Sequence, residues 1–302
     1  MAISRKSGVI IMAKILVFGE ILWDIFDKES FIGGAPLNFA AHSNIFGAQT
    51  ALISAIGNDK LGEETKLKIK EYGINDRMIQ CLDEFRTGVT LVTLKNGQPD
   101  YKITKNVAFD NISYSDELQK EINNFAPDCF YFGTVSQRGK VSAQTLKSIL
   151  KNTDFKHIFC DLNLRKDNLT EKTINFSLEN CTILKINREE KKILEKIYFE
   201  ESALSTIEFS KLLCKKFSNL KLLIITLDKD GAYIYNNNTN SGFIQETSEC
   251  KIVSATGAGD AFCAAFITNY LDGKSLEECA KKATKIANYV LGFKEAIPPK
   301  GE

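Results

Sequence analysis

Residues 250–267 read CKIVSATGAGDAFCAAFI and join a β-type run, Lys251–Val253, to a helix of small apolar residues. Gly257 and Gly259 lie between these parts, and glycine adopts backbone conformations that are closed to residues with a side chain. We therefore expect a helix N-terminus whose free N–H groups bind an anion, most often phosphate. Asp260, in the first turn of that helix, is placed to accept a proton. Because an aspartate has a reference pKa of about 3.9, we expect Asp260 to be ionised at neutral pH.

Two other glycine motifs fit this part of the chain less well. A dinucleotide-binding fingerprint needs a third glycine where Phe262 stands, and it usually occurs in the first strand–helix unit. A Walker A loop would end at residues 273–275, GKS, but Thr268 stands where its first glycine is required. For the tetrapeptide GAGD alone, an ordinary glycine-rich helix start with a capping aspartate remains the alternative.

A second group of polar and glycine residues surrounds the start of an expected helix, Ala35–Gly47. Asp24 follows an N-terminal strand, and Gly33 and Gly34 leave the backbone open to a ligand. Asn38 lies one helical turn later. A carboxylate and an amide together suit a polyhydroxylated ligand, because the first accepts hydrogen bonds and the second both donates and accepts them. The alternative is a plain helix N-terminus with Asp24 as a turn residue.

Apolar runs alternate with helical patterns along most of the chain. The helical patterns include residues 203–217 and 276–291, and the second has a capping box, since Ser275 is followed three residues later by Glu278. Continuous apolar runs are typical of strands covered on both faces. We therefore expect an α/β fold with a largely parallel sheet and helices on both sides. The expected strands are 15–18, 51–56, 129–132, 157–160, 182–184 and 222–225.

Residues 87–109 do not follow this alternation. They read as strand, turn and strand around Asn96-Gly97, which is a strong hairpin signal. A shorter strand-like piece covers residues 25–32. Because no helices are available to cover these pieces, we expect a small antiparallel β element that projects from the main domain. A simple surface hairpin is the alternative.

The charge balance of the 302-residue chain excludes some partners. It carries 39 Lys and Arg against 38 Asp and Glu, so the formal charge is 39 − 38 = +1. A nucleic acid or a membrane surface selects a large basic excess, and we expect neither as a partner. No apolar run reaches the ~18 residues of a membrane helix, and the start lacks the apolar core of a secretory signal. We expect a cytoplasmic protein, with Met12 as an alternative start.

The metal and disulfide content expected from the sequence is low. Eight cysteines form no CxxC pair, and the only histidines are His42 and His157. Zinc ribbons and histidine metal sites are therefore not expected. Buried free thiols are the simplest interpretation of the cysteines, several of which lie in apolar runs.

The segments Gly33–Gly62 and Val253–Phe262 together resemble the paired signatures of the ribokinase-like (PfkB) carbohydrate kinases. The resemblance extends from about Lys14 to Pro298, and its GGAP and FGTVSQR forms are most similar to the bacterial fructokinase branch. It implies a three-layer αβα sandwich around a mainly parallel sheet, with a small β-sheet lid. The implied main domain covers residues 13–24, 33–86 and 110–302, and the implied lid covers 25–32 and 87–109.

The resemblance also implies roles for individual residues. Asp260 matches the catalytic base, and Gly257, Ala258 and Gly259 match the anion hole for the transferring phosphoryl group. The remaining implied roles are sugar binding by Asp24, Gly33, Gly34 and Asn38, contact with substrate or phosphate by Arg165, association with phosphate and hydrated Mg²⁺ by Asn187 and Glu190, and lining of the nucleotide site by Thr226, Gly231 and Asn288. No residue is expected to ligate a metal directly.

Two positions depart from the family pattern. Ser254 stands where the family usually has an aspartate associated with a monovalent cation, so activation by potassium is an open question. Asp228 stands where a glycine is usual, and its charge would repel ATP phosphates unless it points outward or toward the ribose. The resemblance further implies ATP and Mg²⁺ as cofactors, and a homodimer formed through the lid.

The expected function is ATP-dependent phosphorylation of a sugar hydroxyl, with fructose converted to fructose 6-phosphate as the first choice. The alternative acceptor is 2-keto-3-deoxygluconate or another small sugar, because Arg165 in the DLNLR segment could face an acidic group. Nucleosides come third. A catalytically silent sugar-binding protein with the same fold and a dinucleotide oxidoreductase are the alternatives from other classes.

Overall fold

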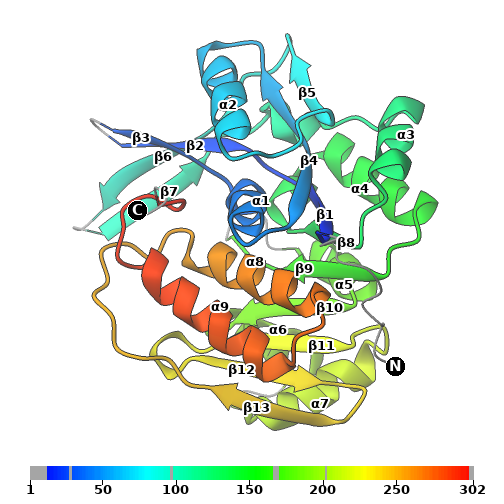
Figure 1. Cartoon of the computed structure of the whole chain (residues 1–302), viewed down its shortest axis with the longest axis vertical. Coiled ribbons are helices and arrows are strands. Elements are labelled where there is room, and N and C mark those ends of the chain that lie inside the picture. The colour runs from blue at the N-terminus through cyan, green and yellow to red at the C-terminus, as the bar shows by residue number, and fades with distance from the viewer. Residues whose placement is uncertain (1–11, 27–28, 96–97, 166–169, 201–202, 299–302) are drawn as a thin grey trace.

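A nine-stranded sheet forms the centre of the computed structural model, which describes residues 12–26, 29–95, 98–165, 170–200 and 203–298 (Figure 1). Its strand order is β13-β12-β11-β10-β9-β8-β1-β4-β5. The strands from β11 to β5 in this order are parallel, and β12 and β13 add an antiparallel edge. The strands are β1 (Lys14–Phe18), β4 (Gln49–Gly57), β5 (Ile79–Leu82), β8 (Cys129–Phe132), β9 (His157–Asp161), β10 (Ile183–Asn187), β11 (Leu222–Thr226), β12 (Ala232–Asn236) and β13 (Ser241–Gln245).

Helices cover both faces of this sheet, which confirms the expected three-layer sandwich. In β1, Leu16 and Phe18 point into one hydrophobic core, and Ile15 and Val17 point into the other. Figure 1 shows α8 and α9 packed side by side over one face. On that face lie α1 (Ala35–Ile45), α2 (Lys60–Glu71), α8 (Ala258–Leu271) and α9 (Leu276–Val290); on the other lie α3 (Asp116–Phe125), α4 (Lys140–Asn152), α5 (Glu171–Glu179), α6 (Arg188–Tyr198) and α7 (Thr206–Lys216).

A separate four-stranded sheet projects from the side of the sandwich (Figure 1). Its order is β3-β2-β6-β7, and β2 is parallel to β6 while the two outer pairs are antiparallel. The expected hairpin turn at residues 96–97 lies outside the described residues. The strands are β2 (Leu22–Ile25), β3 (Ser30–Gly33), β6 (Gly88–Lys95) and β7 (Gln98–Ile103).

The first part of this small sheet differs from the expected single strand over residues 25–32. The structure has two strands there, and the sheet begins at Leu22, so Asp24 lies within a strand rather than in a turn. Side chains alternate between the two faces of a strand, so Trp23 and Asp24 point to opposite faces. Trp23 donates a hydrogen bond of 2.9 Å to Oγ1 of Thr65 in α2.

Short sequence motifs predicted the start of α9 correctly but did not predict the conformation of Lys251–Val253. The capping box at the start of α9 is present, with Ser275 Oγ accepting from the Glu278 N–H at 3.2 Å. The prediction of a β-type run at Lys251–Val253 was wrong. The Val253 N–H bonds instead to the carbonyl of Leu291 at 2.7 Å, just past the end of α9, so this segment joins no sheet.

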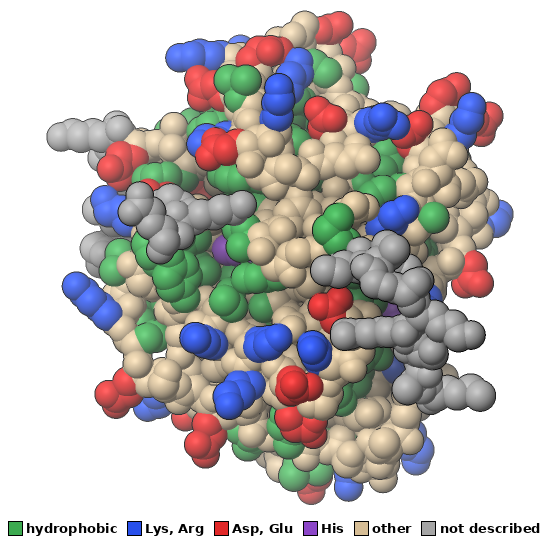
Figure 2. All heavy atoms as spheres, viewed as in Figure 1, with side chains coloured by type: hydrophobic (Ala, Val, Ile, Leu, Met, Phe, Trp, Pro, Cys, Tyr) green, Lys and Arg blue, Asp and Glu red, His purple; other side chains and the backbone are tan. Residues whose placement is uncertain are grey.

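All eight cysteines are free, and only Cys81 and Cys250 are exposed. Within the described ranges, no helix combines the length and the apolar character needed to cross a membrane. Figure 2 shows acidic and basic side chains dispersed over one face, with basic side chains gathered over α9, where Lys281, Lys282 and Lys285 are exposed.

Candidate active site

The anion-binding turn has the backbone that the sequence predicts. Gly257 caps α8 with φ 80°, in the left-handed region that favours glycine. A Cβ atom at this position would lie 2.6 Å from the Cα, Cβ and O atoms of Ala296, so no side chain fits there. Asp260 lies in the first turn of α8 and is partly buried, and its Oδ2 accepts a hydrogen bond of 2.8 Å from the amide of Asn38.

The protonation of Asp260 differs from expectation. Burial, followed by the nearby charge of Asp161, raises its pKa to about 7, and Asn38, Lys185 and Arg165 oppose the rise. At neutral pH the carboxyl of the free protein is therefore not fully ionised. A base whose pKa lies near the working pH transfers protons more effectively than a weaker base does.

A buried ion pair that the sequence interpretation overlooked lies behind the anion-binding turn. Lys185 of β10 lies 3.1 Å from Asp161 at the end of β9. Its Nζ atom would be 3.4 Å from a Cβ at Gly259, so the ammonium group stands next to the turn. Although burial lowers the pKa of Lys185, the charge of Asp161 raises it above its ordinary value, so the lysine carries a fixed positive charge. The signal was present, because a lysine interrupts the apolar strand ILKIN.

The residues predicted to bind a sugar come together at the join between the two sheets. A Cβ at Gly33 would lie 3.3 Å from Asp24 Oδ2, so this glycine makes room for the carboxylate. Gly34 caps α1 with φ 107°, and Asn38 one turn later reaches Asp260. Burial raises the pKa of Asp24, while a hydrogen bond from Thr90 of β6 and the charge of Arg165 oppose the rise.

Arg165 supplies positive charge to this acidic region. Its residue is exposed and follows β9, and it lowers the pKa of Asp24 and of Asp260. The same guanidinium acts on a third carboxyl, that of Glu20, which sequence reasoning did not select. Arg165 is therefore close enough to contribute positive charge to all three carboxyls.

Asn187 and Glu190 form a capping box at the start of α6. The two carboxylate oxygens of Glu190 accept from the backbone N–H groups of Asn187 at 2.8 Å and Leu164 at 2.7 Å. Burial raises the pKa of Glu190. Both oxygens already accept backbone hydrogen bonds. The carboxylate is therefore better suited to contact the waters of a hydrated magnesium ion than to bind the ion directly.

The residues predicted to line a nucleotide lie on several elements. Thr226 ends β11 directly beside Asn187 in the sheet register. Gly231 has φ 89°, and a Cβ there would lie 2.0 Å from the Gln245 carbonyl oxygen. Asn288 of α9 makes hydrogen bonds with Thr247 and Ser248, which follow the Gln245–Glu246 backbone that packs against Gly231.

Asp228 and Ser254, the two positions that depart from the family pattern, both make contacts that the structure describes. Asp228 has φ 53° and pairs with Arg188 at 3.4 Å, so part of its charge is balanced and its side chain is 75% exposed. The same arginine contacts Asp230 at 2.5 Å. Ser254 Oγ accepts a hydrogen bond of 3.1 Å from the Thr256 N–H, which shapes the approach to the turn.

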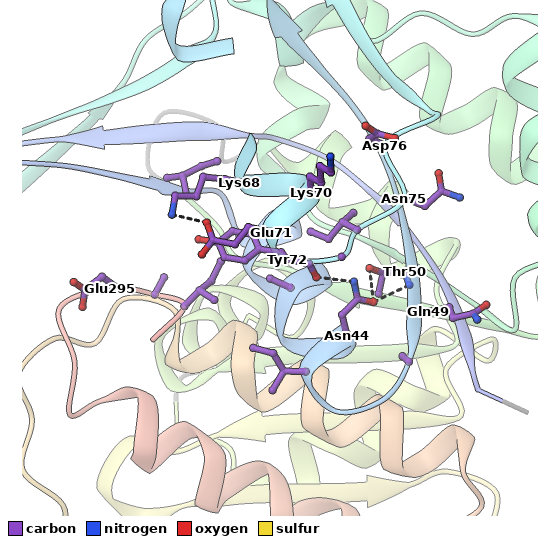
Figure 3. A pocket seen from close by; sticks show the side chains of 18 of the residues that line it. Asn44, Gln49, Thr50, Lys68, Lys70, Glu71, Tyr72, Asn75, Asp76 and Glu295 are labelled. Atoms are coloured by element: carbon purple, nitrogen blue, oxygen red, sulfur yellow. Dashed lines mark hydrogen bonds and ion pairs between the residues drawn. The ribbon is translucent and has the colours of Figure 1, made fainter. Parts of the chain in front are cut away.

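A cavity of about 1440 Å³ lies elsewhere, and none of the predicted site residues line it. Figure 3 shows Asn44 bonded to the carbonyl of Tyr72 and to Thr50, and Lys68 paired with Glu71. These contacts occupy the side chains of Asn44, Lys68 and Glu71 within the lining of the cavity.

The site combines a carboxyl with a pKa near neutrality and a glycine-lined helix N-terminus with a buried lysine behind it. These features fit a phosphotransferase that acts on a hydroxyl group. The comparisons agree. Residues 10–300 match the pfkB family carbohydrate kinases, so the chain belongs to that family and is an ATP-dependent carbohydrate kinase.

Curated relatives are similar over nearly the whole chain. An ATP-dependent 6-phosphofructokinase from Thermoanaerobacterium thermosaccharolyticum is 25% identical, covering 94% of this chain and 89% of the relative. A probable fructokinase-2 from Arabidopsis thaliana is 26% identical, covering 91% and 87%. Among solved structures, a sugar kinase from Pyrococcus horikoshii in complex with ATP is 25% identical, with a TM-score of 0.78 and 95% of both chains covered. A fructokinase with bound ATP from Xylella fastidiosa has a TM-score of 0.82 at 17% identity over 94% of both chains, which supports the fold.

Proposed function

We propose that the protein transfers the terminal phosphoryl group of ATP to D-fructose and forms fructose 6-phosphate. The observation that supports the proposal is the hydrogen bond from Asn38 to Asp260, because it joins the proposed base to one of the proposed acceptor residues. Fructokinases among the relatives support fructose as the acceptor. Another relative is named a 6-phosphofructokinase, and that name describes an enzyme that acts on a sugar phosphate.

Each half of the site has its own task in this reaction. The N–H groups at the start of α8 and the ammonium group of Lys185 stabilise the charge on the transferring phosphoryl oxygens. Asp260 removes the proton of the attacking hydroxyl, a contribution of typically ~10²–10⁴-fold. Asp24 and Asn38 orient the sugar so that this hydroxyl faces the phosphate. We propose that closure of the small sheet then excludes water and limits ATP hydrolysis.

Magnesium would enter with ATP. Glu190 would hold it through waters, since its oxygens remain occupied by backbone N–H groups. When bound, the ion neutralises phosphate charge and orients the chain of phosphates.

Two alternatives to a fructokinase can each be related to a specific residue. A sugar acid such as 2-keto-3-deoxygluconate, or another small sugar, is favoured by the exposed guanidinium of Arg165, which could pair with a carboxylate of the substrate. A silent sugar-binding protein would not need the raised pKa of Asp260. A homodimer through the small sheet is supported by the exposed apolar side chains of Leu91 in β6 and of Phe26 just after β2, which are 45% and 37% exposed.

An ADP-release assay with a panel of sugars, run with MgATP and with or without potassium, tests the proposal. We expect fructose to give the highest kcat/KM. Turnover confined to a sugar acid would replace fructose by the alternative acceptor. Sugar binding without any ADP release would favour the silent binding protein. Light scattering measures whether the chain is a dimer.

A further inference from the structure

Glu20 is a buried carboxyl beside the acceptor region that the proposed mechanism does not use. It follows β1 and precedes β2, and its residue is only 3% exposed. Its Oε2 atom is buried and has no hydrogen-bond partner. Because buried polar atoms are almost always paired in folded proteins, this carboxyl oxygen is available to bind a ligand.

Packing places Glu20 directly against the turn that opens α1. A Cβ at Gly34 would lie 2.5 Å from the carbonyl oxygen of Glu20 and 3.4 Å from its Cγ. Gly19 directly precedes Glu20, and a Cβ at Gly19 would lie 3.5 Å from Ser136 Oγ in η2 (Val135–Arg138). Three separate parts of the chain therefore meet at Glu20.

Two further buried oxygens in this region also lack partners. One is Oδ1 of Asn38, whose amide nitrogen is used by Asp260, and the other is Oγ of Ser136. Unpaired oxygens therefore come from the segment after β1, from α1 and from η2, and the packing of Gly34 and Gly19 brings these three parts of the chain together. Several donors and acceptors that converge from different elements are typical of a site that orients a small polar ligand.

The charges around Glu20 decide which protonation state it holds. Burial raises its pKa to about 7, a hydrogen bond from its own backbone N–H opposes the rise, and Asp260 of α8 adds to it. Arg165, after β9, and Arg138 of η2 lower it. Burial, and to a lesser extent the charges of Asp161, Cys263, Asp260 and Glu20, raise the pKa of Tyr131 in β8. A neutral ligand that excludes water would favour the uncharged carboxyl further.

We propose that Glu20 binds the acceptor, donating a hydrogen bond from its protonated carboxyl through Oε2 to an oxygen atom of a neutral polyhydroxylated substrate. The inference rests on the proposed function and deepens it. It assigns opposite protonation states to two neighbouring carboxyls, since Asp260 must be ionised to act as the base. The kcat/KM for the acceptor should therefore be bell-shaped in pH, with limbs that belong to the coupled pair.

The test uses Glu20→Gln and Glu20→Ala in the full-length chain, with steady-state kinetics for the acceptor and for ATP. Glu20→Ala should raise the acceptor KM at least about tenfold and leave the ATP KM within about threefold, because one hydrogen bond and its orienting effect are lost. Glu20→Gln keeps a donor of the same size, so the KM should stay within about fivefold. Its pH profile should lose the alkaline limb and keep only the rise due to Asp260.

Ser136→Ala and Ser43→Ala form a matched pair, since both serines are buried and have unpaired Oγ atoms. Only Ser136→Ala should raise the acceptor KM, since Ser43 lies farther along α1. A Glu20→Gln profile that superimposes on that of the wild type, or a Glu20→Ala protein with an unchanged acceptor KM, overturns the inference.

Failure of the proposed function gives a different result. If the wild type phosphorylates no sugar of the panel, the proposed function fails, while the protonation of Glu20 is still measured by ¹³C NMR of its carboxyl. An ordinary pKa near 4.5 in that measurement would contradict the inference on its own.

Discussion

The side-chain amide of Asn38 donates a 2.8 Å hydrogen bond to Oδ2 of Asp260, which joins α1 to α8 across 222 residues of sequence. The two helices start at the same edge of the sheet, and each starts at a glycine with positive φ. This contact places the residue that would take the proton beside the residues that would hold the acceptor.

Asp260→Asn should lower kcat at least about a hundredfold while the sugar KM stays similar, because the base is lost and the shape is kept. Asp272→Asn at the end of α8 is the control, and it should leave kcat unchanged. Steady-state kinetics at saturating ATP measure both. Near-normal turnover by Asp260→Asn would remove this residue from the role of base.

Asn38→Ala should move the acidic limb of the kcat profile to higher pH. The hydrogen bond from Asn38 lowers the pKa of Asp260, so its loss leaves less of the ionised base at neutral pH. Turnover should fall near pH 7 and recover in part near pH 9. If the pH profile keeps its position and only its height changes, the amide does not tune the base.

Comparing Gly257→Ala with Gly273→Ala separates the effect of backbone strain from the effect of a steric clash at the anion-binding turn. Both glycines have similar φ, 80° and 78°, but only at Gly257 would a Cβ meet other atoms, those of Ala296. Gly273→Ala should cost about 1 kcal/mol of stability and leave kcat unchanged. Gly257→Ala should lower kcat about a hundredfold, because the N–H groups of the turn must move. Equal kinetics in the two variants would contradict the assignment of the anion-binding turn.

Lys185→Met should lower the free energy of unfolding by about 3–5 kcal/mol, because Asp161 is left buried without its partner. Adding Asp161→Asn should restore much of that stability. The double variant should nevertheless stay slow, since the positive charge behind the phosphate turn is still missing. Denaturant unfolding and kcat measure the two effects separately. Recovery of both together would mean that Lys185 is only structural.

Glu20→Gln should change how stability depends on pH. Burial raises the pKa of Glu20 from 4.5 to about 7, so the folded protein binds this proton more tightly than the unfolded chain. The free energy of unfolding should therefore fall as pH rises from about 4.5 to about 7, by on the order of 3 kcal/mol. The advantage of Glu20→Gln over the wild type should grow over that range. Parallel Tm curves for the two proteins would contradict the raised pKa.

The sequence predicted the layers of the fold because helices and strands repeat their apolar residues at different periods. It also predicted the turn at Gly257, because glycine favours a positive φ, and in the folded chain a Cβ there would clash with Ala296. It missed Lys185 and Glu20, whose roles depend on neighbours that are distant in sequence. The pKa of Asp260 was missed for the same reason, because burial and the charge of Asp161 are properties of the folded chain.

The small sheet shares its backbone with the acceptor site. The chain runs from β1 through Glu20 into β2, which carries Asp24, and from β3 through Gly34 into α1. If the small sheet closes as proposed, its connections to the main domain contain the residues proposed to bind the sugar. Substitutions that change acceptor preference should then also change the rate at which the sheet opens.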